Sequence, residues 1–178
     1  MSDDTLHLAQ RQRFDSLCMP LSKDVFRFVY WMCRDRMLAE DVLQETLLRA
    51  WRSLGSLADQ SAVRPWLFTI ARRELARVFE RKRLDTIDLE AVDDAQSADL
   101  AADDRYDLHQ MRHAILRLEL IHREPLVLQV LFGYSTEEIA RQLQISVPAV
   151  LTRLYRAREI LRKQLLSRSG GRSSTDEL

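Results

Sequence analysis

Arginine recurs in the C-terminal third of the chain at spacings that could bind nucleic acid. The segment TEEIARQLQISVPAVLTRLYRAREILRKQL, residues 136–165, carries six cations, five of them in its second half: Arg153, Arg156, Arg158, Arg162 and Lys163. A guanidinium group can grip a phosphate, and it can also form two hydrogen bonds to a guanine edge in the major groove. Such chemistry needs an element that presents these side chains on one surface.

The same segment predicts two helices separated by a short break. The first helix spans 136–143 and the break is Gln144-Ile145-Ser146, where the Ser146 hydroxyl can cap the second helix. Pro148 falls in the first turn, where a missing N–H costs little. An apolar stripe follows at spacings of three and four: Val147, Val150, Leu154, Ala157, Leu161 and Leu165. This pattern indicates a helix-turn-helix; the alternative is an amphipathic helix with a solvated cationic face.

The segment 38–54 predicts a helix with two chemically different faces. The apolar face, which we expect in a core, is Leu43, Leu47, Ala50 and Leu54. The opposite face places carboxylates and an amide around a leucine: Asp41, Gln44, Glu45, Leu48 and Arg52. That face is either an ordinary solvated surface or a docking surface for a partner helix.

Aromatic and basic side chains share the predicted helix 63–83. Its apolar positions are Trp66, Leu67, Ile70, Ala71, Leu75, Val78 and Phe79, and its cationic flank is Arg72, Arg73, Arg77, Arg81, Lys82 and Arg83. This combination suits single-stranded or melting DNA, because arginines hold the backbone while bases stack or enter pockets. Trp66 is also explained as a core aromatic.

Composition and periodicity together predict an all-α chain. Of its 178 residues only four are glycine and four are proline, and strand-like alternation is hard to find. Three further helices are expected at 22–34, 107–120 and 123–133, the last ended by Gly133. Their expected core positions are Val25, Phe26, Val29 and Met32 in the first, and Leu108, Met111, Ile115 and Leu118 in the second.

The zero net charge is the sum of three charged blocks, of which two are basic and one is acidic. Residues 72–83 carry six basic and two acidic side chains, and residues 147–168 carry six basic and one acidic. Between them, residues 85–107 carry nine acidic side chains and one arginine. We therefore expect four parts: a helical domain over 10–84, a flexible acidic linker over 85–106, a second helical domain over 107–167, and a disordered polar tail over 168–178.

Residues that could support other chemistry are sparse. His109 and His113 stand at i and i+4, a possible metal-ligand spacing, but no HExxH motif, cysteine pair or third ligand accompanies them. Cys18 and Cys33 are expected to be reduced rather than a redox pair. With no nucleophile or acid–base constellation, we expect no enzyme activity, cofactor, metal or small-molecule substrate. The absence of a signal peptide and of a long apolar run predicts a cytoplasmic location.

Three segments, in this order, resemble the bacterial RNA polymerase sigma factors of the sigma-70 family: AEDVLQETLLRAWRSL, RPWLFTIARRELARVFERKR and EEIARQLQISVPAVLTRLYRAR. The resemblance is to the small group IV, or extracytoplasmic function (ECF), type and extends over residues 14–167. It implies a sigma-2-like domain and a sigma-4-like helix-turn-helix domain, joined by the acidic linker. Such a factor binds core RNA polymerase at its clamp and flap. It directs promoter recognition, melting of the −10 element and transcription initiation, and it contacts both double- and single-stranded promoter DNA.

The resemblance also implies which residues act. Core polymerase binding falls on Asp41, Gln44, Glu45, Leu48 and Arg52. Contacts to the −10 element fall on Leu57, in the loop 55–61, and on Arg72, Arg73, Arg77 and Arg81. Contacts to the −35 element fall on the helix-turn-helix (136–155), at Ser146, Ala149, Leu151, Thr152, Arg153, Arg156 and Arg158. An anti-sigma factor is a further implied partner, which could hold the chain at the inner membrane.

Four positions depart from the pattern of that family, and one of them is Leu57, which stands where many relatives have an aromatic or longer side chain. Gln144 replaces the usual glycine of the turn, Pro148 replaces a small residue, and Leu151 stands where the residue is often basic. Leu151 should remove about one phosphate contact and lower the salt slope by roughly 0.9, and it could meet a thymine methyl group. The alternative interpretation of the whole chain is a stand-alone helix-turn-helix regulator that binds duplex DNA without polymerase.

Overall fold

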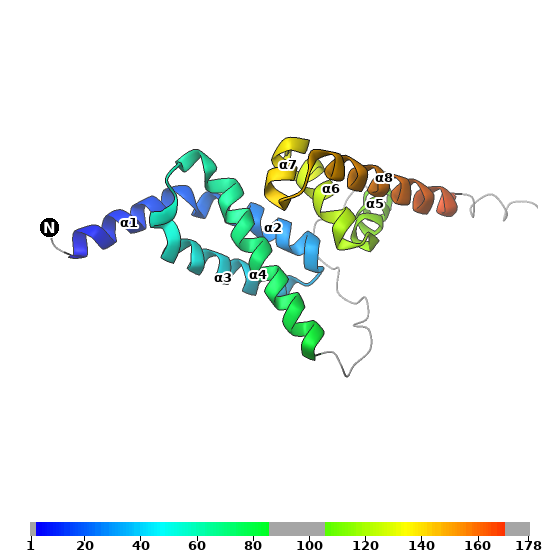
Figure 1. Ribbon diagram of the computed structural model, residues 1–178. Helices are drawn as coiled ribbons and strands as arrows, with labels where there is room; N and C mark the ends of the chain where they lie inside the picture. The colour runs from blue at the N-terminus through cyan, green and yellow to red at the C-terminus, as the bar shows by residue number, and fades with distance from the viewer. Residues whose placement is uncertain (1–2, 86–105, 170–178) are drawn as a thin grey trace, which may run out of the picture. The chain divides into compact units, whose positions relative to one another are not determined.

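Helices build both compact units of the chain, Met1–Gln96 and Ser97–Leu178 (Figure 1). The computed structural model describes residues 3–85 and 106–169. The first unit contains α1 (Asp3–Leu17), α2 (Ser22–Cys33), α3 (Arg36–Ser53) and α4 (Val63–Asp85), with the 3-10 turns η1 (Met19–Leu21), η2 (Leu54–Ser56) and η3 (Gln60–Ala62). The second contains α5 (Tyr106–Arg117), α6 (Leu120–Phe132), α7 (Thr136–Leu143) and α8 (Val147–Ser169). Within the described ranges there is no strand, which confirms the all-α prediction.

The predicted linker and tail fall almost wholly outside the described residues. Of the linker at 85–106, only Asp85 and Tyr106 are described, as the ends of α4 and α5. Of the tail at 168–178, only the first two residues are described, and they continue α8 to Ser169. None of the helices in the described ranges is both long enough and apolar enough to span a membrane.

The core of the first unit forms where α2, α3 and α4 pack on one another. Its buried apolar side chains on these helices are Val25, Phe28, Val29, Met32, Ala39, Val42, Ala50, Leu67, Phe68, Ala71 and Leu75. The rings of Phe28 and Phe68 join α2 to α4 with their centroids 5.1 Å apart. The buried hydroxyl of Thr46 is satisfied within α3, because it donates to the carbonyl of Val42 at 2.6 Å.

The buried stripes differ from the predicted ones by about one residue. Phe28 rather than Phe26 points into the core, and Leu43 and Leu47 are half-buried beside the fully buried Val42. One residue turns a helix by roughly 100°, so neighbouring positions can exchange places in a core without any change in the apolar pattern. The predictions for Val25, Val29, Met32, Ala50 and Leu54 are confirmed.

The connection from α2 to α3 is short, because the C-cap residue of α2 is followed directly by the N-cap residue of α3. Arg34 ends α2 in the left-handed conformation, with φ of 62°. Asp35 then caps α3, and its Oδ1 accepts a hydrogen bond from the Leu38 N–H at 3.0 Å. A side-chain cap of this kind satisfies one of the amides that lack a partner at the start of a helix.

Helix α8 is the centre of the second unit and packs against α5, α6 and α7. The predicted stripe is confirmed at Val150, Leu154, Ala157 and Leu161, all buried. Their apolar partners on the other helices include Leu116, Leu126, Val127, Leu128, Phe132, Ile139 and Leu143. The prediction of Met111 as a core residue is wrong, because its side chain is 40% exposed.

The boundary between α5 and α6 also differs from the prediction. Helix α5 ends at Arg117 rather than at 120, and α6 begins at Leu120 rather than at 123. Arg123 explains the earlier break: its buried guanidinium donates from Nη1 to the Leu116 carbonyl at 2.7 Å. The last carbonyls of a helix need such partners, and a buried arginine seven residues along the chain supplies one here. Gly133 ends α6 in the left-handed conformation, as predicted.

The helix-turn-helix is confirmed with its predicted first helix, Thr136–Leu143. Ser135 and Glu138 form a reciprocal capping box: the serine Oγ accepts from the Glu138 N–H at 3.2 Å, and Glu138 Oε2 accepts from the Ser135 N–H at 2.7 Å. Gln144 ends α7 at φ 56°, in the left-handed region. Ser146 then caps α8, with its Oγ accepting from the Ala149 N–H at 3.4 Å. The glycine that the family pattern expects at 144 therefore marks a real backbone requirement.

We predict that Gln144→Gly stabilises the second unit by about 0.5–1 kcal/mol, because glycine adopts the left-handed conformation without the Cβ clash. Trp31, Trp51 and Trp66 are the only tryptophans and all lie in the first unit. Urea unfolding followed by far-UV circular dichroism should shift to higher urea, while the tryptophan fluorescence transition stays in place.

Arg141→Gly, an exposed position of α7, is the control for glycine itself. It should destabilise the second unit by about 1 kcal/mol, since that position has ordinary helical geometry. A lower unfolding midpoint for Gln144→Gly would mean that the glutamine side chain contributes more than the backbone strain costs.

Candidate nucleic-acid and partner interfaces

The first turns of α8 present a mixed polar, apolar and cationic surface. Opposite the buried stripe, the side chains of Ser146, Leu151, Thr152, Tyr155, Arg156 and Arg158 are exposed, and those of Ala149 and Arg153 are half-buried. Leu151 is 53% exposed and Tyr155 is 61% exposed, so two large side chains stand among the polar groups of this surface. The Thr152 hydroxyl donates to the backbone carbonyl of Pro148 at 2.9 Å.

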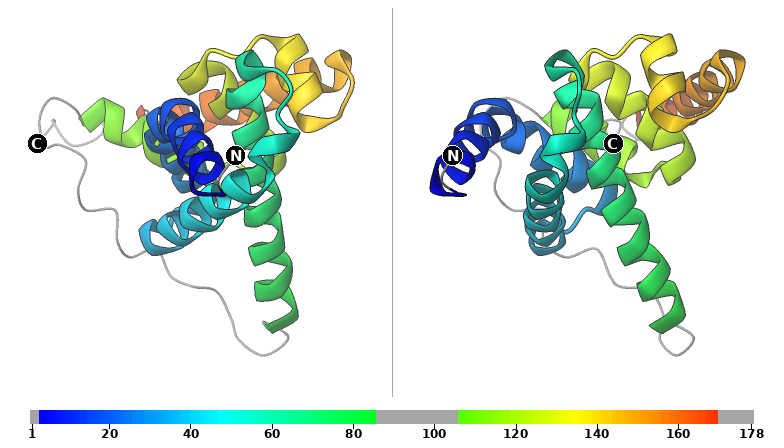
Figure 2. Two further views of the ribbon diagram at one scale, coloured as in Figure 1. Left: turned by 90° about the vertical axis from the view of Figure 1, so that its left-hand side faces the viewer. Right: turned by 60° about the vertical axis from the view of Figure 1, so that its left-hand side comes forward.

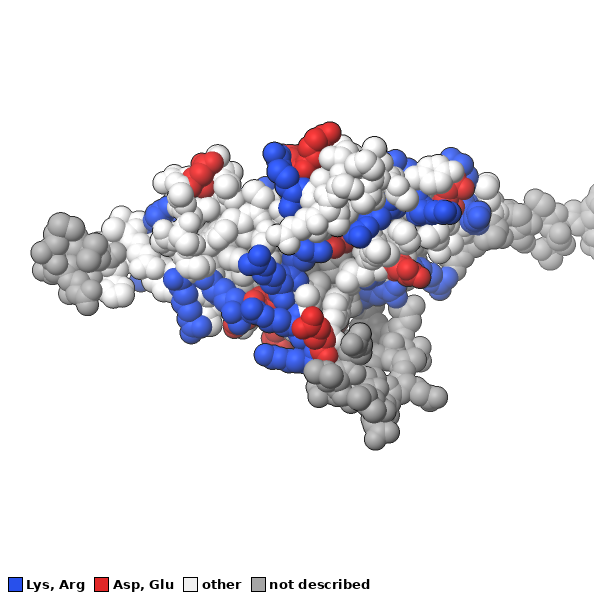
Figure 3. Space-filling model, viewed as in Figure 1, with Lys and Arg blue, Asp and Glu red and all other residues white. Residues whose placement is uncertain are grey.

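Two of the α8 arginines already have partners inside the unit. Arg158 Nη2 donates to the Gln129 side-chain oxygen at 2.7 Å and so joins α8 to α6. Arg162 pairs with Glu159 one turn earlier, at 2.9 Å. Figure 3 shows basic side chains along α8.

One face of α3 carries the predicted partner-binding residues. The side chains of Asp41, Gln44, Leu48 and Arg52 are exposed, and that of Glu45 is half-buried. They recur at spacings of three and four on the side of α3 away from Ala39, Val42 and Ala50. Leu48 is 42% exposed among these polar groups. The face therefore offers charge, an amide and an apolar side chain to a partner.

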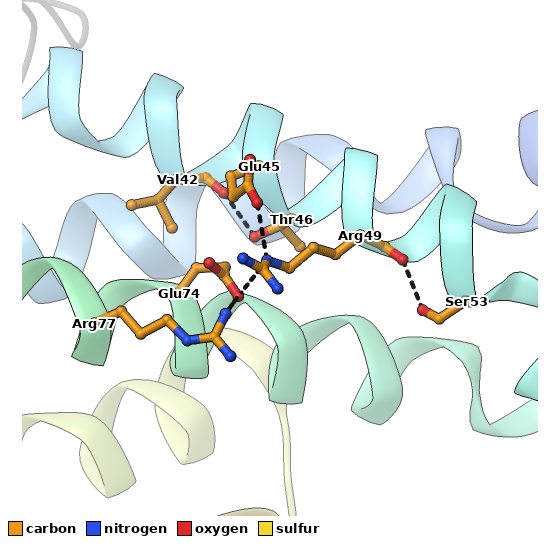
Figure 4. A network of polar contacts seen from close by, with 7 residues as sticks. All are labelled: Val42, Glu45, Thr46, Arg49, Ser53, Glu74 and Arg77. Atoms are coloured by element: carbon orange, nitrogen blue, oxygen red, sulfur yellow. Dashed lines mark hydrogen bonds and ion pairs between the residues drawn. The ribbon is translucent and has the colours of Figure 1, made fainter.

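A cluster of four charged side chains joins α3 to α4 (Figure 4). The carboxylate of Glu74 is at its centre and only 7% exposed; its Oε1 lies 2.7 Å from Arg49 Nε and 2.6 Å from Arg77 Nη1. Glu45 lies 2.9 Å from the same Arg49 nitrogen. The Nε–H of Arg49 is not directed at either oxygen, so these contacts are ion pairs rather than well-aligned hydrogen bonds. A buried carboxylate needs such partners, because desolvation without them is costly.

The predicted DNA-binding arginines of α4 separate into two kinds. Arg73, Arg77 and Arg81 are exposed and four residues apart, so they form one row along the helix. Arg72, one residue away, is half-buried. Both views of Figure 2 show the C-terminal end of α4 extending beyond α2 and α3. Basic side chains gather over α4 and α3 on the face drawn in Figure 3.

Leu57 does not present its side chain to solvent. It is 5% exposed and belongs to the core, and its contact to the −10 element stays a prediction. The exposed residues of the same loop are Gly55, Ser56, Ala58, Asp59, Gln60 and Ser61. Asp59 caps η3: hydrogen bonds from the Ser61 hydroxyl at 2.6 Å and the Ser61 N–H at 2.8 Å lower the pKa of its carboxyl. The loop is therefore an ordered, exposed surface built over Leu57.

The two cysteines are free thiols in protected surroundings. Burial raises the pKa of Cys18 to about 11, against a smaller opposing effect of Arg13, and burial also raises the pKa of Cys33. Both remain protonated at neutral pH and are poor nucleophiles. No group of three or more His, Cys, Asp or Glu side chains that could hold a metal occurs among the described residues, and the side chain of His109 lies outside them.

Sequence reasoning missed the two residues that organise the first unit most visibly. Glu74 interrupts the apolar face of α4 between Ala71 and Leu75. A carboxylate at a core position signals a buried ion pair, and this signal was available from the sequence. Arg13 gave no such signal, because its partner lies 44 residues away in the chain.

Comparisons with known proteins agree with the resemblance. The family model for sigma-70 region 2 matches residues 17–84, and the model for sigma-70 region 4 matches residues 108–161. The RNA polymerase sigma factor CarQ of Myxococcus xanthus is 35% identical over 155 residues, which cover 85% of this chain and 88% of CarQ. The ECF sigma factor SigX of Bacillus subtilis is 26% identical over 164 residues, 86% of this chain and 84% of SigX.

A solved structure shares the fold over nearly the same span. The sigma factor RpoE of Bartonella quintana, crystallised with the anti-sigma factor NepR, superposes with a TM-score of 0.76 at 25% identity. The similarity covers 86% of this chain and 97% of that one.

We predict that Glu74→Gln lowers the free energy of unfolding of the first unit by about 1–2 kcal/mol, because two arginines lose their shared anion. Urea unfolding followed by tryptophan fluorescence measures this unit alone. Glu80→Gln, exposed on the same helix, is the matched control and should change stability by less than about 0.5 kcal/mol. Equal midpoints for the two variants would show that the ion cluster contributes nothing beyond a surface pair.

Proposed function

We propose which surfaces of this chain bind polymerase and which bind DNA. The chain belongs to the ECF group of the sigma-70 family of RNA polymerase sigma factors. It binds core polymerase and directs promoter recognition and transcription initiation. The observation that carries this conclusion is the match of regions 2 and 4, in order, to the two helical units. The residues that perform each step are our proposal.

The exposed face of α3 is the proposed site for core polymerase. Asp41 and Gln44 supply an anion and an amide, and Leu48 supplies apolar contact area beside them. Arg52 extends the same row, whereas Glu45 is partly occupied by Arg49. A charged face with one apolar residue fits a helical partner that is itself charged, such as the clamp helices of polymerase.

The row of arginines on α4 is the proposed site for the −10 element. Arg73 and Arg81 can hold the phosphates of a strand that is separating, with Arg72 beside them. Arg77 lies in the same row and would reach a phosphate with the donors that its contact to Glu74 leaves unused. The exposed loop residues 55–61 then surround an unpaired base. Leu57 supports that loop from below.

The exposed face of α8 is the proposed reader of the −35 element. Arg153, Arg156 and Thr152 offer hydrogen bonds to base edges and phosphates in the major groove. Ser146 and Ala149 lie at the N-terminal end of α8, where they can approach the sugar-phosphate backbone of the DNA. Leu151 offers an apolar contact at a place where a cation would bind phosphate.

The promoter affinity of two weak DNA-binding sites rises when one chain carries both sites. Core polymerase fixes the spacing of the two domains, so binding of one DNA element raises the effective concentration of the other. The acidic segment between residues 85 and 107 has nine carboxylates and one arginine, which keeps it off DNA. We further propose cytoplasmic action as a binding factor without catalysis of its own, and an anti-sigma factor as regulator, as for the RpoE that was crystallised with NepR.

The test of the proposed function is run-off transcription with bacterial core polymerase and a pool of randomised promoters. The chain should make core enzyme initiate on one class of sequences, which identifies both elements. Failure to initiate, together with binding of the chain alone to duplex DNA, would favour the stand-alone regulator instead.

We predict that Asp41→Ala with Gln44→Ala weakens binding to core polymerase by about tenfold or more, because two polar contacts are lost at the centre of the interface. Titration of labelled chain with core enzyme measures the affinity. Tryptophan fluorescence should report an unchanged fold, since both side chains are exposed.

The matched control is Arg153→Ala with Arg156→Ala in the second unit. This pair should keep its affinity for core polymerase and lose transcription from promoters that depend on the −35 element. Loss of core binding by both pairs, or by neither, contradicts the proposed division between α3 and α8.

We predict that Leu151→Arg steepens the salt dependence of promoter binding by the assembled polymerase. One added phosphate contact changes the slope of log K against log salt by about 0.9. Filter binding at several salt concentrations gives the slope. Leu151→Gln, polar but uncharged, should leave the slope unchanged; a slope that stays constant for both variants would place Leu151 away from the DNA backbone.

A further inference from the structure

Side chains of helix α1 contact the last turn of α3 and the loop that follows it. Arg13 Nη2 donates to the Leu57 carbonyl at 2.7 Å, and Gln10 Nε2 donates to the Trp51 carbonyl at 3.1 Å. Between them, the rings of Phe14 and Trp51 meet edge to face, with centroids 5.4 Å apart and planes at 80°. Gln10, Arg13 and Phe14 lie within about one turn of α1, so the three contacts place one face of α1 against the end of α3 and the loop after it.

These bonds satisfy backbone groups that the helix and loop leave without partners. The Trp51 carbonyl lies in the last turn of α3, where no later helical N–H reaches it. Leu57 lies just after η2 in an extended conformation, φ −79° and ψ 93°, and its N–H bonds back to the Leu54 carbonyl at 3.1 Å. Among the contacts that the structure describes, the Leu57 carbonyl accepts one hydrogen bond, and its donor is Arg13 on α1.

The placement of Arg13 points to a positioning role rather than to a gain in stability alone. Its side chain is half-buried, and its Nε is buried with no hydrogen-bond partner among the described residues. The contact of this guanidinium to the loop is therefore made by its terminal nitrogen Nη2. What it fixes is the carbonyl of a core residue, Leu57, directly beneath an exposed loop.

We propose that Arg13 is a positioning residue that sets the geometry of the loop 55–61 and thereby the base preference at the −10 element. The proposal rests on the proposed function, in which the exposed residues of this loop surround an unpaired base. Arg13 itself does not touch DNA. It holds the loop through Leu57, while Gln10 and Phe14 fix the end of α3 from which the loop starts.

The test is a competition among promoters within one reaction. A pool randomised over the −10 element is transcribed with wild-type chain and with Arg13→Ala, and the transcripts are sequenced. The preference for the best base over the worst at the unpaired position should fall about tenfold in Arg13→Ala, the scale of one charge-assisted hydrogen bond. Affinity for core polymerase should stay within about twofold, because the α3 face is unchanged.

Three further variants separate positioning from general damage. Arg13→Lys keeps one charged donor and should restore part of the base preference. Gln10→Ala removes an uncharged donor one turn away and should weaken the preference less than Arg13→Ala. Arg11→Ala is the matched control on the same helix: its partner is Asp15, at 3.9 Å, and both side chains are largely exposed, so it should behave as wild type.

The outcomes distinguish this proposal from the proposed function. A fall in total transcripts from Arg13→Ala with the base preference unchanged overturns the positioning role and leaves a structural one. An equal loss of preference in Arg11→Ala also overturns it. If the wild-type chain fails to initiate anywhere in the pool, the proposed function fails before Arg13 is reached.

Discussion

The residues that α3, α4 and α8 bury decide which of their polar side chains stay exposed, and the proposed sites on these helices depend on that choice. In α8 the choice is clear, because the buried row from Val150 to Leu161 leaves the cationic residues outside. In α3 the small residues Ala39 and Ala50 lie inside, which turns Asp41 and Gln44 outward. The apolar cores therefore do more than stabilise two small units: they decide which polar groups a partner can meet.

The polar contacts inside the first unit add a second constraint. Glu74 is a buried anion between Arg49 and Arg77, so it ties the helix that carries the proposed polymerase face to the helix that carries the proposed DNA face. Arg49 also contacts Glu45, which belongs to the first of these faces. Charged residues that look alike in the sequence thus divide into those that hold the fold and those that are left for partners.

The local features of the fold were predictable from the sequence, whereas contacts between distant residues were not. The limits of α7, the Ser146 cap and the Gly133 end depend on neighbouring residues, and all three predictions are confirmed. Periodicity gave the apolar face of α2 but placed Phe26 inside instead of Phe28, since a pattern cannot resolve a rotation of roughly 100°. The burial of Leu57 depends on packing across the unit, which no local pattern records.

The central claim is that α3 faces polymerase while α8 faces DNA, and site-specific photocrosslinking tests it most directly. A photoreactive amino acid would replace Gln44 in one sample and Leu151 in another, and each chain would be assembled with core polymerase on a promoter. The account predicts a crosslink from position 44 to a polymerase subunit and from position 151 to promoter DNA. A crosslink from position 44 to DNA, or from position 151 to protein alone, would contradict it.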